Sequence, residues 1–299
     1  MKLSVIIPTC GRREMLRKCL ECLIPQLDQL PDEVESIVCD DGSESDTCAM
    51  IKADFPIVRW HEGPKRGPAA NRNLGAAAAR GEWLIFLDDD CIPAKDFLAA
   101  YTRAIGSLKD RRAALEGVTA SPERPSLLWE APHNLNGGVL ISCNFAIRRD
   151  EFEKFGKFDE RFPVAAFEDT EFAARFAAFG GKTVFVKDAL VEHPLRPIPS
   201  AKKLALRWEG KVIMSLDYGA SSTHVMLRLP WHVLRVIQSR FRGRNCSLAN
   251  VHAALIFACE WLLVCWWMRG WMRSYKECGR SQFWKKHFTC HPVLPKYGF

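Results

Sequence analysis

Three consecutive carboxylates, Asp88, Asp89 and Asp90, directly follow the apolar segment 83–87. Like charges at the exit of a buried strand repel one another and lose solvation, so they require a cation nearby. Mg²⁺ and Mn²⁺ prefer oxygen ligands, and Mg²⁺ is commonly held between carboxylates and the phosphates of a substrate. The three acids therefore indicate a metal and diphosphate site. An acidic turn after a core strand explains the same residues, and this segment alone does not separate the two interpretations.

A second pair of carboxylates, Asp40 and Asp41, also follows a predicted strand, 34–39, and precedes a glycine. Carboxylate oxygens at this position can accept hydrogen bonds from a uracil N–H group or from ribose hydroxyls. Thr9, just past the first predicted strand, is expected beside them. The sequence Asp-Gly-Ser is equally typical of an Asx turn, which needs no ligand.

Three further positions carry groups that suit this chemistry. A helix begins after Gly67, and both its N-terminus and Arg72 suit phosphate oxygens. Glu168 and Asp169 open another helix, either as caps or with a general base at the mouth of a site. His193 follows a strand and is a candidate neutral imidazole ligand for a metal, although a lone histidine is usually structural.

Strands and helices alternate through the first two thirds of the 299 residues, which predicts an α/β fold with a mostly parallel sheet. Because ligands bind beyond the carboxyl ends of parallel strands, we expect the polar residues after the strands to gather at one edge. The strands are expected at 3–8, 34–39, 57–61, 83–87, 139–148, 183–186 and 190–193. The helices are expected at 12–27, 68–80, 94–108, 151–155 and 170–179.

The charge of the chain is unevenly distributed. Residues 200–299 hold 16 Lys and Arg against 4 Asp and Glu, while the remainder holds 26 against 31. Seven of the ten tryptophans also lie in residues 201–299. This asymmetry predicts an acidic catalytic body over 1–195, and a basic, aromatic, helical region over 196–299 that meets an anionic surface.

The 12 cysteines are scattered, and many fall inside predicted strands or helices, where a free cysteine acts as a small apolar residue. No second pair follows Cys19 and Cys22 at zinc spacing, so no zinc site is expected. The N-terminal apolar run is too short for a signal peptide. Together these features predict a protein of the reducing cytoplasm.

The order and spacing of the motifs resemble the nucleotide-sugar half of family 2 glycosyltransferases with the GT-A fold. The motifs are Val5-Ile-Ile-Pro-Thr9, Cys39-Asp-Asp-Gly-Ser43, Asn71-Arg-Asn-Leu-Gly75 and Phe86-Leu-Asp-Asp-Asp90. Phe158-Asp-Glu-Arg-Phe162 and Phe167-Glu-Asp169 resemble the acceptor half. The resemblance covers about residues 1–195. It implies a Rossmann-like GT-A domain in which 1–92 binds the nucleotide sugar and 93–195 the acceptor.

The resemblance also implies residue roles. Nucleotide-sugar contacts fall on Pro8, Thr9, Asp40, Asp41, Arg72, Asp88 and Asp89. Metal ligation falls on Asp90, Asp88 and His193, and catalysis on the base Asp169 with its neighbour Glu168. Gly137, Gly138 and Asn144 lie where sugar contacts are expected, but match loosely. Asn71 departs from the alanine usual in the family.

The implied reaction moves a sugar from a nucleoside-diphosphate sugar, most commonly a UDP-sugar, to an acceptor hydroxyl. It is metal-dependent, with Mg²⁺ or Mn²⁺, and inverts the sugar's stereochemistry in one displacement. By analogy the pathway is the assembly of surface polysaccharide or glycolipid, with a lipid-linked glycan as an acceptor.

Two other functions remain open from the residues alone. A nucleotidyltransferase that makes sugar nucleotides also needs a metal and an α/β sheet, although the loop after the first strand is only a faint version of the basic loop such enzymes use. A non-enzymatic binder of nucleic acid or an anionic surface is permitted by the basic tail. The acidic first half argues against a nucleic-acid partner, and the missing G-x-G-x-x-G motif argues against a nicotinamide enzyme.

The C-terminal segment 250–268 is apolar and has basic residues on both sides. Its length is marginal for a membrane span, and Glu260 near its middle is unfavourable in a bilayer. A second basic and aromatic amphipathic segment covers 226–237. We therefore expect peripheral attachment to the cytoplasmic face of a membrane.

Overall fold

The computed structural model describes residues 2–30, 33–42, 46–122, 126–162, 164–242, 244 and 247–280. The chain forms two compact units. The first consists of Met1–Glu123, Ala131–Pro163 and Glu168–Pro194, and the second of Arg124–Glu130, Val164–Phe167 and Leu195–Phe299.

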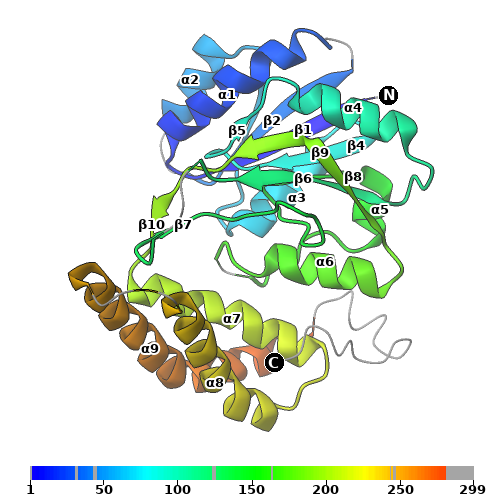
Figure 1. The fold of residues 1–299 in the computed structure, drawn as a ribbon. Helices are drawn as coiled ribbons and strands as arrows, with labels where there is room; N and C mark the ends of the chain where they lie inside the picture. The colour runs from blue at the N-terminus through cyan, green and yellow to red at the C-terminus, as the bar shows by residue number, and fades with distance from the viewer. Residues whose placement is uncertain are drawn as a thin grey trace. The chain divides into compact units, whose positions relative to one another are not determined.

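The first unit is built on an eight-stranded sheet with the order β3-β2-β1-β4-β8-β6-β9-β5 (Figure 1). Its strands are β1 (Leu3–Thr9), β2 (Val34–Asp40), β3 (Arg59–Glu62), β4 (Trp83–Leu87), β5 (Ile92–Pro93), β6 (Ala114–Ala120), β8 (Asn144–Arg148) and β9 (Thr183–Glu192). The pairs β1–β2, β1–β4, β2–β3 and β6–β9 are parallel, whereas β8 and β5 run antiparallel to their neighbours. The predicted α/β class with a mostly parallel sheet is confirmed.

Helices cover both faces of this sheet. On one face lie α1 (Arg13–Leu27), α2 (Asp46–Asp54) and α4 (Phe97–Ser107), and on the other α3 (Pro68–Ala78), α5 (Arg149–Lys154) and α6 (Glu168–Ala178). Side chains alternate along β1, so Val5 and Ile7 pack under the first group of helices and Ile6 under the second. A strand buried on both sides reads as a continuous apolar run, which explains why β1 and β4 were predicted from composition.

Phenylalanines fix the start of α6 against the sheet. Phe172 on α6 lies 6.2 Å from Phe145 on β8 and 5.4 Å from Phe152 on α5, measured between ring centroids. Phe86 on β4 stacks on Phe145 at 4.9 Å. Tilted and edge contacts at these distances add to the burial of large apolar rings. The first turn of α6 is therefore held at a fixed place relative to the end of β4.

Two elements differ from the expectation because of residues that weaken a strand pattern. The strand predicted at 139–148 begins only at Asn144, since residues 134–142 form a loop held by hydrogen bonds to Glu116. The strand β6 was not predicted, because Glu116 and Gly117 interrupt its apolar pattern. Gly117 lies at a register shift where an added Cβ would come within 2.3 Å of the Ala189 carbonyl oxygen. The helix α2 was not predicted either.

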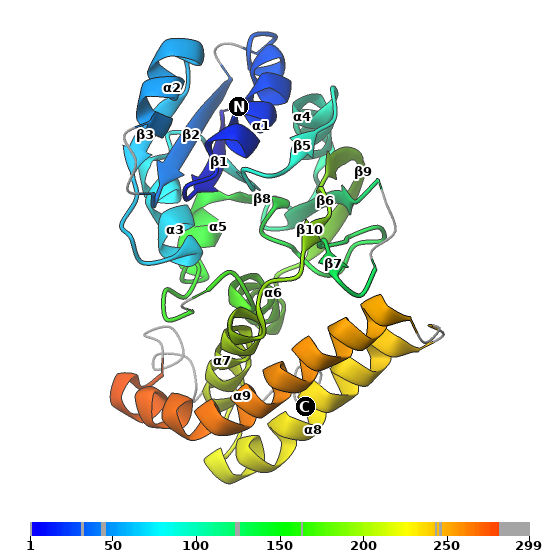
Figure 2. The same ribbon diagram turned by 90° about the vertical axis from the view of Figure 1, so that its left-hand side faces the viewer.

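The second unit contains the helical C-terminal region. Its elements are α7 (Ala201–Asp217), α8 (Ser222–Phe241), α9 (Leu248–Cys278) and a small antiparallel pair, β7 (Trp129–Glu130) with β10 (Arg196–Pro197). Ser200, Ser221 and Ser247 cap the three helices with their side-chain oxygens. Helices α8 and α9 lie side by side (Figure 2) around a core that includes Leu229 and Val264.

Substitution of Gly75 tests the packing of α3 on the sheet. An added Cβ would lie 2.4 Å from Ile6 Cγ2 and 3.2 Å from Cys39 Sγ. We expect Gly75→Ala to lower the free energy of unfolding by about 1–3 kcal/mol, because overpacking outweighs the better helix propensity of alanine. Urea denaturation measures this change.

The matched control is Gly106→Ala in α4, where no atom lies within 4 Å of an added Cβ. This variant should be unchanged or stabilised by up to about 1 kcal/mol. Equal effects of the two substitutions would contradict the packing of α3 described above.

Candidate active site

The sequence-predicted polar residues gather at the carboxyl ends of neighbouring parallel strands. Thr9 ends β1, Asp40 ends β2 and Asp88 follows β4. These three strands are adjacent in the sheet, so their ends meet at one edge.

The three acids after β4 point to three different partners. Asp88 pairs with Arg72, at 2.6 Å between Oδ1 and Nη2. Asp89 Oδ2 accepts a hydrogen bond from Thr9 Oγ1 at 2.6 Å, and Asp89 Oδ1 forms an ion pair with Arg12 Nη2 at 2.6 Å. Asp90 pairs with the second Nη of Arg12 at 2.7 Å. Two arginines therefore supply the positive charge that three adjacent carboxylates require.

Asp89 is the most buried of these acids. Burial raises the pKa of its carboxyl to about 7; Arg12 and the Thr9 hydroxyl oppose this shift, while Asp90 and Asp88 add to it. Its side chain has no exposed surface. In this conformation the buried Asp89 carboxylate orients the side chains of Thr9 and Arg12. Its expected contact with a nucleotide sugar stays a prediction.

Asp90 and His193 form a candidate metal centre. His193 Nε2 lies 3.2 Å from Asp90 Oδ1, and both side chains are almost fully buried. Burial alone would lower the pKa of His193, but the hydrogen bond and charge of Asp90 raise it. His193 Nδ1 lies 3.0 Å from the Pro194 carbonyl oxygen, which orients the ring. A carboxylate oxygen and an imidazole nitrogen suit Mn²⁺, which accepts nitrogen ligands more readily than Mg²⁺.

Cys91 is the third potential ligand atom near this pair. Its pKa is raised well above the usual value by its contact with Cys143 and by burial. A thiol that stays protonated is a poor metal ligand, because thiolate is the binding form. The residues therefore fit a metal held by Asp90 and His193 better than one held by Cys91.

Arg72 links the end of β4 to the start of α6. Its guanidinium is almost fully buried, and it pairs with Asp88 and, at 3.0 Å, with Glu168 Oε1. Burial raises the pKa of Glu168 to about 7; the charge of Asp169 adds to this and the charge of Arg72 opposes it. Glu168 Oε2 is buried and accepts no hydrogen bond from the residues that the structure describes. Glu168 thus serves here as the buried partner of Arg72.

Asp169 lies in the first turn of α6 and is only partly buried. Its Oδ1 accepts from the Thr170 backbone N–H at 2.7 Å, and its Oδ2 accepts from the Ser142 N–H at 3.3 Å and Oγ at 3.4 Å. The two long bonds to Ser142 leave Oδ2 weakly held. A partly exposed carboxylate in such a position can accept a proton from a bound hydroxyl.

Asp40 and Asp41, at and just after the end of β2, accept hydrogen bonds from backbone N–H groups in this structure. Asp40 Oδ1 accepts from the Gly42 N–H at 2.8 Å, which is the Asx-turn bond. Asp41 accepts from the Lys65 N–H at 2.9 Å and from the Gly67 N–H at 3.1 Å. Asp41 therefore fixes the entry to α3. Pro8 is buried within β1.

Asn144 begins strand β8, and Gly137 and Gly138 lie in the loop that precedes it. Asn144 donates to the carbonyl oxygens of Val118 and Ala189 and accepts from the Tyr101 hydroxyl at 2.7 Å. Its amide is committed to the fold. Gly137 and Gly138 have φ of 80° and 91°, which glycine adopts without strain.

Three contributors were not identified from the sequence. Arg12 neutralises Asp89 and Asp90, Ser142 contacts Asp169, and Glu116 holds the loop that carries Ser142. Arg12 follows the first strand and was noticed only as part of a faint basic loop. Ser142 and Glu116 carry no local signal, because their partners are 27 and 22 to 24 residues away along the chain.

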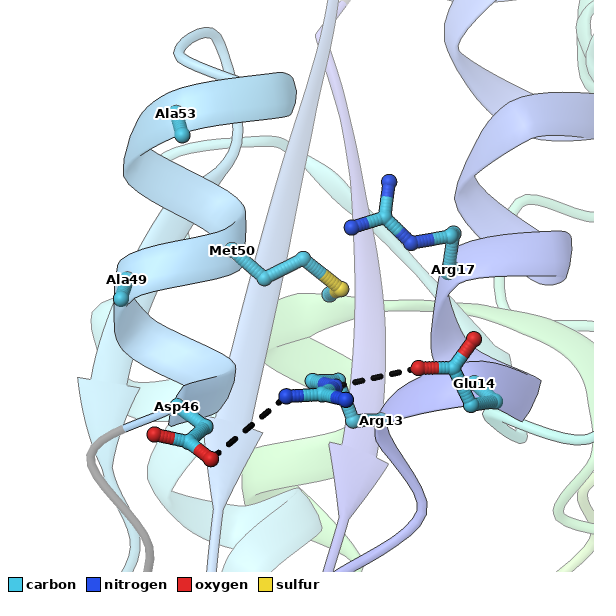
Figure 3. Close-up of a pocket in the computed structure, with 7 residues that line it drawn as sticks. All are labelled: Arg13, Glu14, Arg17, Asp46, Ala49, Met50 and Ala53. Atoms are coloured by element: carbon cyan, nitrogen blue, oxygen red, sulfur yellow. Dashed lines mark hydrogen bonds and ion pairs between the residues drawn. The ribbon is translucent and has the colours of Figure 1, made fainter.

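A cavity of about 490 Å³ lies elsewhere in the first unit, between α1 and α2 (Figure 3). Among its charged groups, Arg13 lies 3.1 Å from Glu14 and 3.5 Å from Asp46, and Arg17 pairs at 2.7 Å with Asp54 outside the lining. None of the residues predicted from the sequence as site residues lines it.

Comparison with known proteins supports a common family. Residues 4–110 match the model described as glycosyl transferase family 2. The uncharacterized glycosyltransferase YfnE of Bacillus subtilis is 41% identical over 107 residues, which cover 35% of this chain and 27% of that protein. The GalNAc(5)-diNAcBac-PP-undecaprenol beta-1,3-glucosyltransferase of Campylobacter jejuni is 36% identical over 94 residues, covering 30% of this chain and 29% of that protein. The matched part is less than a third of either relative.

Two solved structures share the fold over most of the chain. S. aureus TarS 1-349 in complex with UDP-GlcNAc has a TM-score of 0.56 at 16% identity, covering 94% of this chain and 93% of that chain. The mannosyltransferase PcManGT from Pyrobaculum calidifontis, in complex with GDP-Man and Mn²⁺, has a TM-score of 0.51 at 17% identity, covering 96% and 79%. These comparisons support the family resemblance noted in the motifs: residues 4–110 match the model of glycosyl transferase family 2, and the chain shares its fold with solved GT-A structures.

Proposed function

We propose that this protein is a metal-dependent, inverting glycosyltransferase, and that it transfers a sugar from a UDP-sugar to an acceptor hydroxyl. The observation that carries the proposal is the arrangement of two groups on one unit: the pair Asp90 and His193 beyond β4, and Asp169 in the first turn of α6. A similar fold binds UDP-GlcNAc in TarS and GDP-Man with Mn²⁺ in PcManGT. Residues 1–92 then form the nucleotide-sugar half and 93–195 the acceptor half.

The chain's own residues have distinct tasks in this reaction. Asp90 and His193 would hold Mn²⁺ or Mg²⁺, with Asp88, nearby in sequence, as a further ligand. When bound, the ion stabilises negative charge on the leaving diphosphate. Asp169 accepts the proton of the acceptor hydroxyl while that oxygen attacks the anomeric carbon from the face opposite the leaving group. A single displacement of this kind inverts the stereochemistry at that carbon.

Arg12 and Arg72 set the charge of the site before substrate binds. Arg12 pairs with Asp89 and Asp90, and Arg72 with Asp88 and Glu168. With a divalent cation at Asp90, Arg12 would no longer need to compensate the whole charge of that carboxylate. The Arg12 side chain is 38% exposed, so it can move toward phosphate oxygens when it leaves Asp90. Thr9, Asp40 and Asp41 border the nucleoside.

The second unit supports a membrane-associated acceptor. Helix α9 is long and apolar enough to cross a membrane by length and composition. Glu260, however, is buried and accepts from Trp208 Nε1 at 2.7 Å, which ties one face of α9 to α7. Leu255, Leu262 and Trp266 remain exposed on α9. We therefore infer peripheral attachment at the cytoplasmic face through α9, with a lipid-linked glycan as acceptor, in surface polysaccharide or glycolipid assembly.

Asp90→Asn tests the metal centre with little change in shape. Wild-type protein should be stabilised by UDP with Mn²⁺, by about 2.7 kcal/mol at 100 times the Kd. Asp90→Asn should lose the Mn²⁺-dependent part of this stabilisation, because an amide cannot supply the ligand charge. A thermal-shift series with UDP, with and without Mn²⁺, measures it. Asp188→Asn, at a carboxylate 76% exposed, is the control and should respond as the wild type does; an unchanged response of Asp90→Asn would remove Asp90 from the centre.

Asp169→Asn tests the base. We expect kcat to fall by at least about 10²-fold, because the amide cannot accept the hydroxyl proton. Binding of UDP with Mn²⁺ should be retained. The control is Asp150→Asn. Asp150 also lies in the first turn of a helix, so this substitution removes the same charge from an equivalent position. Near-normal turnover of Asp169→Asn, measured as UDP release, would assign the base to another residue.

Arg12→Gln tests charge compensation at the carboxylates. We expect the metal-free variant to lose about 1–3 kcal/mol of unfolding free energy, because Asp89 and Asp90 lose their common partner. Mn²⁺ alone should then stabilise the variant more than it stabilises the wild type. Urea unfolding with and without Mn²⁺ measures both effects. Arg13→Gln, in which a neighbouring arginine with surface partners is replaced, should show neither; a smaller Mn²⁺ effect in Arg12→Gln would refute the proposed competition.

A further inference from the structure

The carboxylate of Asp169 is held by donors from two different residues. Its Oδ1 accepts from the N–H and the Oγ1 of Thr170, at 2.7 and 3.3 Å, and these donors belong to the same turn of α6. Its Oδ2 accepts from the N–H and the Oγ of Ser142, at 3.3 and 3.4 Å. Ser142 lies 27 residues earlier in the chain. The orientation of the Asp169 carboxylate therefore depends on a loop outside α6 as well as on α6 itself.

A tight turn directs both donors of Ser142 to the same carboxylate oxygen. The N–H of Asn144 donates to the carbonyl oxygen of Ile141 at 3.1 Å, so residues 141–144 form a β-turn with Ser142 at its second position. The N–H at that position takes no part in the hydrogen bond that closes the turn. It donates to Asp169 instead, together with the hydroxyl of the same residue. Ser142 is 4% exposed, so solvent competes little for these donors.

The path of the loop before this turn is fixed by Glu116 on β6. The Glu116 carboxylate is buried and accepts from the N–H groups of Gly138, Val139 and Leu140, at 2.7, 3.1 and 3.1 Å. Burial alone would raise the pKa of Glu116, but these N–H groups lower it, so the anchor is charged at neutral pH. Leu140 has a φ of 42°, which a side chain of this size rarely adopts. A backbone conformation of this kind persists only where the surrounding contacts hold it, and it is frequent at functional sites.

The lengths of the Ser142 bonds favour a role in orientation over a role in stability. Both are longer than the usual separation of about 2.9 Å for an N–H donor or about 2.7 Å for a hydroxyl donor. Such bonds restrain the direction of Oδ2 and leave it able to take a further proton, because a carboxylate oxygen has two lone pairs. The Thr170 N–H, at 2.7 Å, occupies Oδ1 more closely. Oδ2 is therefore the oxygen of Asp169 that is better suited to accept a proton.

We propose that Ser142 is a positioning residue for Asp169, and that Glu116 holds Ser142 in place for this task. The inference rests on the proposed function, in which Asp169 is the general base. Before the reaction, the Ser142 hydroxyl donates to the ionised Oδ2.

In the reaction, the O–H bond of the acceptor breaks and an Oδ2–H bond forms on Asp169. The acceptor oxygen bonds to the anomeric carbon, and the bond from that carbon to the diphosphate breaks, with its electron pair leaving on the diphosphate. Ser142 keeps its own proton. Its hydroxyl can rotate to accept a hydrogen bond from the new Oδ2–H, since a serine hydroxyl is both donor and acceptor.

The first experiment combines Ser142→Ala and Asp169→Asn, singly and together, in the full-length protein. The rate measured is UDP release from UDP-GlcNAc and from UDP-glucose with Mn²⁺, with water in place of an acceptor sugar, because a general base activates any bound hydroxyl. We expect Ser142→Ala to lower kcat by about tenfold, the order of one hydrogen bond to a charged group, and to leave KM for the UDP-sugar unchanged. In the Asp169→Asn background the same substitution should have no further effect, because residues that act as a unit are not additive.

Two further variants separate the hydroxyl from general effects of the substitution. Ser142→Thr keeps a hydroxyl at this position and should restore turnover to nearly the wild-type rate. The matched control is Ser36→Ala on β2, which removes a fully buried hydroxyl that has no hydrogen-bond partner among the residues that the structure describes. Ser36→Ala should leave both kcat and KM unchanged.

The second experiment does not depend on turnover. Crystal structures of the wild type and of Ser142→Ala, each with UDP and Mn²⁺, show the direction of the Asp169 carboxylate. We expect Oδ2 to stay on Ser142 in the wild type, and the carboxylate to rotate or to occupy more than one orientation in Ser142→Ala. A single, unchanged orientation in the variant would overturn the positioning role.

The rates distinguish failure of this inference from failure of the proposed function. Near-normal turnover of Asp169→Asn would remove the base, and the role of Ser142 with it. A low rate for Asp169→Asn beside a normal rate for Ser142→Ala would overturn the positioning role alone. Equal losses from Ser142→Ala in the two backgrounds would assign Ser142 to the fold rather than to the base.

Discussion

The fold of the first unit brings several carboxylates close together, and the rest of the site is arranged around the need to offset their mutual repulsion. Asp88, Asp89 and Asp90 follow β4, and the first turn of α6 adds Glu168 and Asp169. So dense an array of acids is unfavourable when partly desolvated, and two arginines from other elements offset it. The same concentration of negative charge is what a divalent cation at the proposed metal centre would neutralise. Under that proposal, the two arginines and the cation would compensate the same set of charges.

Much of this arrangement was predictable from the sequence, for a physical reason. The strands β1, β2 and β4 are buried on both faces, so they appear as unbroken apolar runs, and each ends in polar residues at the same edge. The acids after β4 were recognised in this way, whereas Asp169 was recognised from its place at the start of a predicted helix. Strand β6 was missed because Glu116 and Gly117 serve long-range contacts rather than the strand pattern. Arg12 was underestimated because its charge partners are distant in sequence.

The second unit shows how one helix can satisfy two environments. Along α9, Val264 and Trp271 face the core formed with α7 and α8, and Glu260 is satisfied by Trp208. The opposite side exposes aliphatic and aromatic groups such as Leu255. Composition alone cannot distinguish such a helix from a membrane span, because both are apolar over a similar length. The buried acid and its indole partner favour the packed arrangement.

Glu116 holds the loop that carries Ser142 mainly through main-chain groups, with a further bond from the Asn134 side chain. Its carboxylate accepts from the N–H groups of Gly138, Val139 and Leu140, while Leu135 and Val139 expose their side chains. A loop anchored by its backbone can exchange its exposed side chains without losing its path. In descendants of this protein, or under directed evolution, such exposed positions are free to change while the geometry around Asp169 is inherited unchanged.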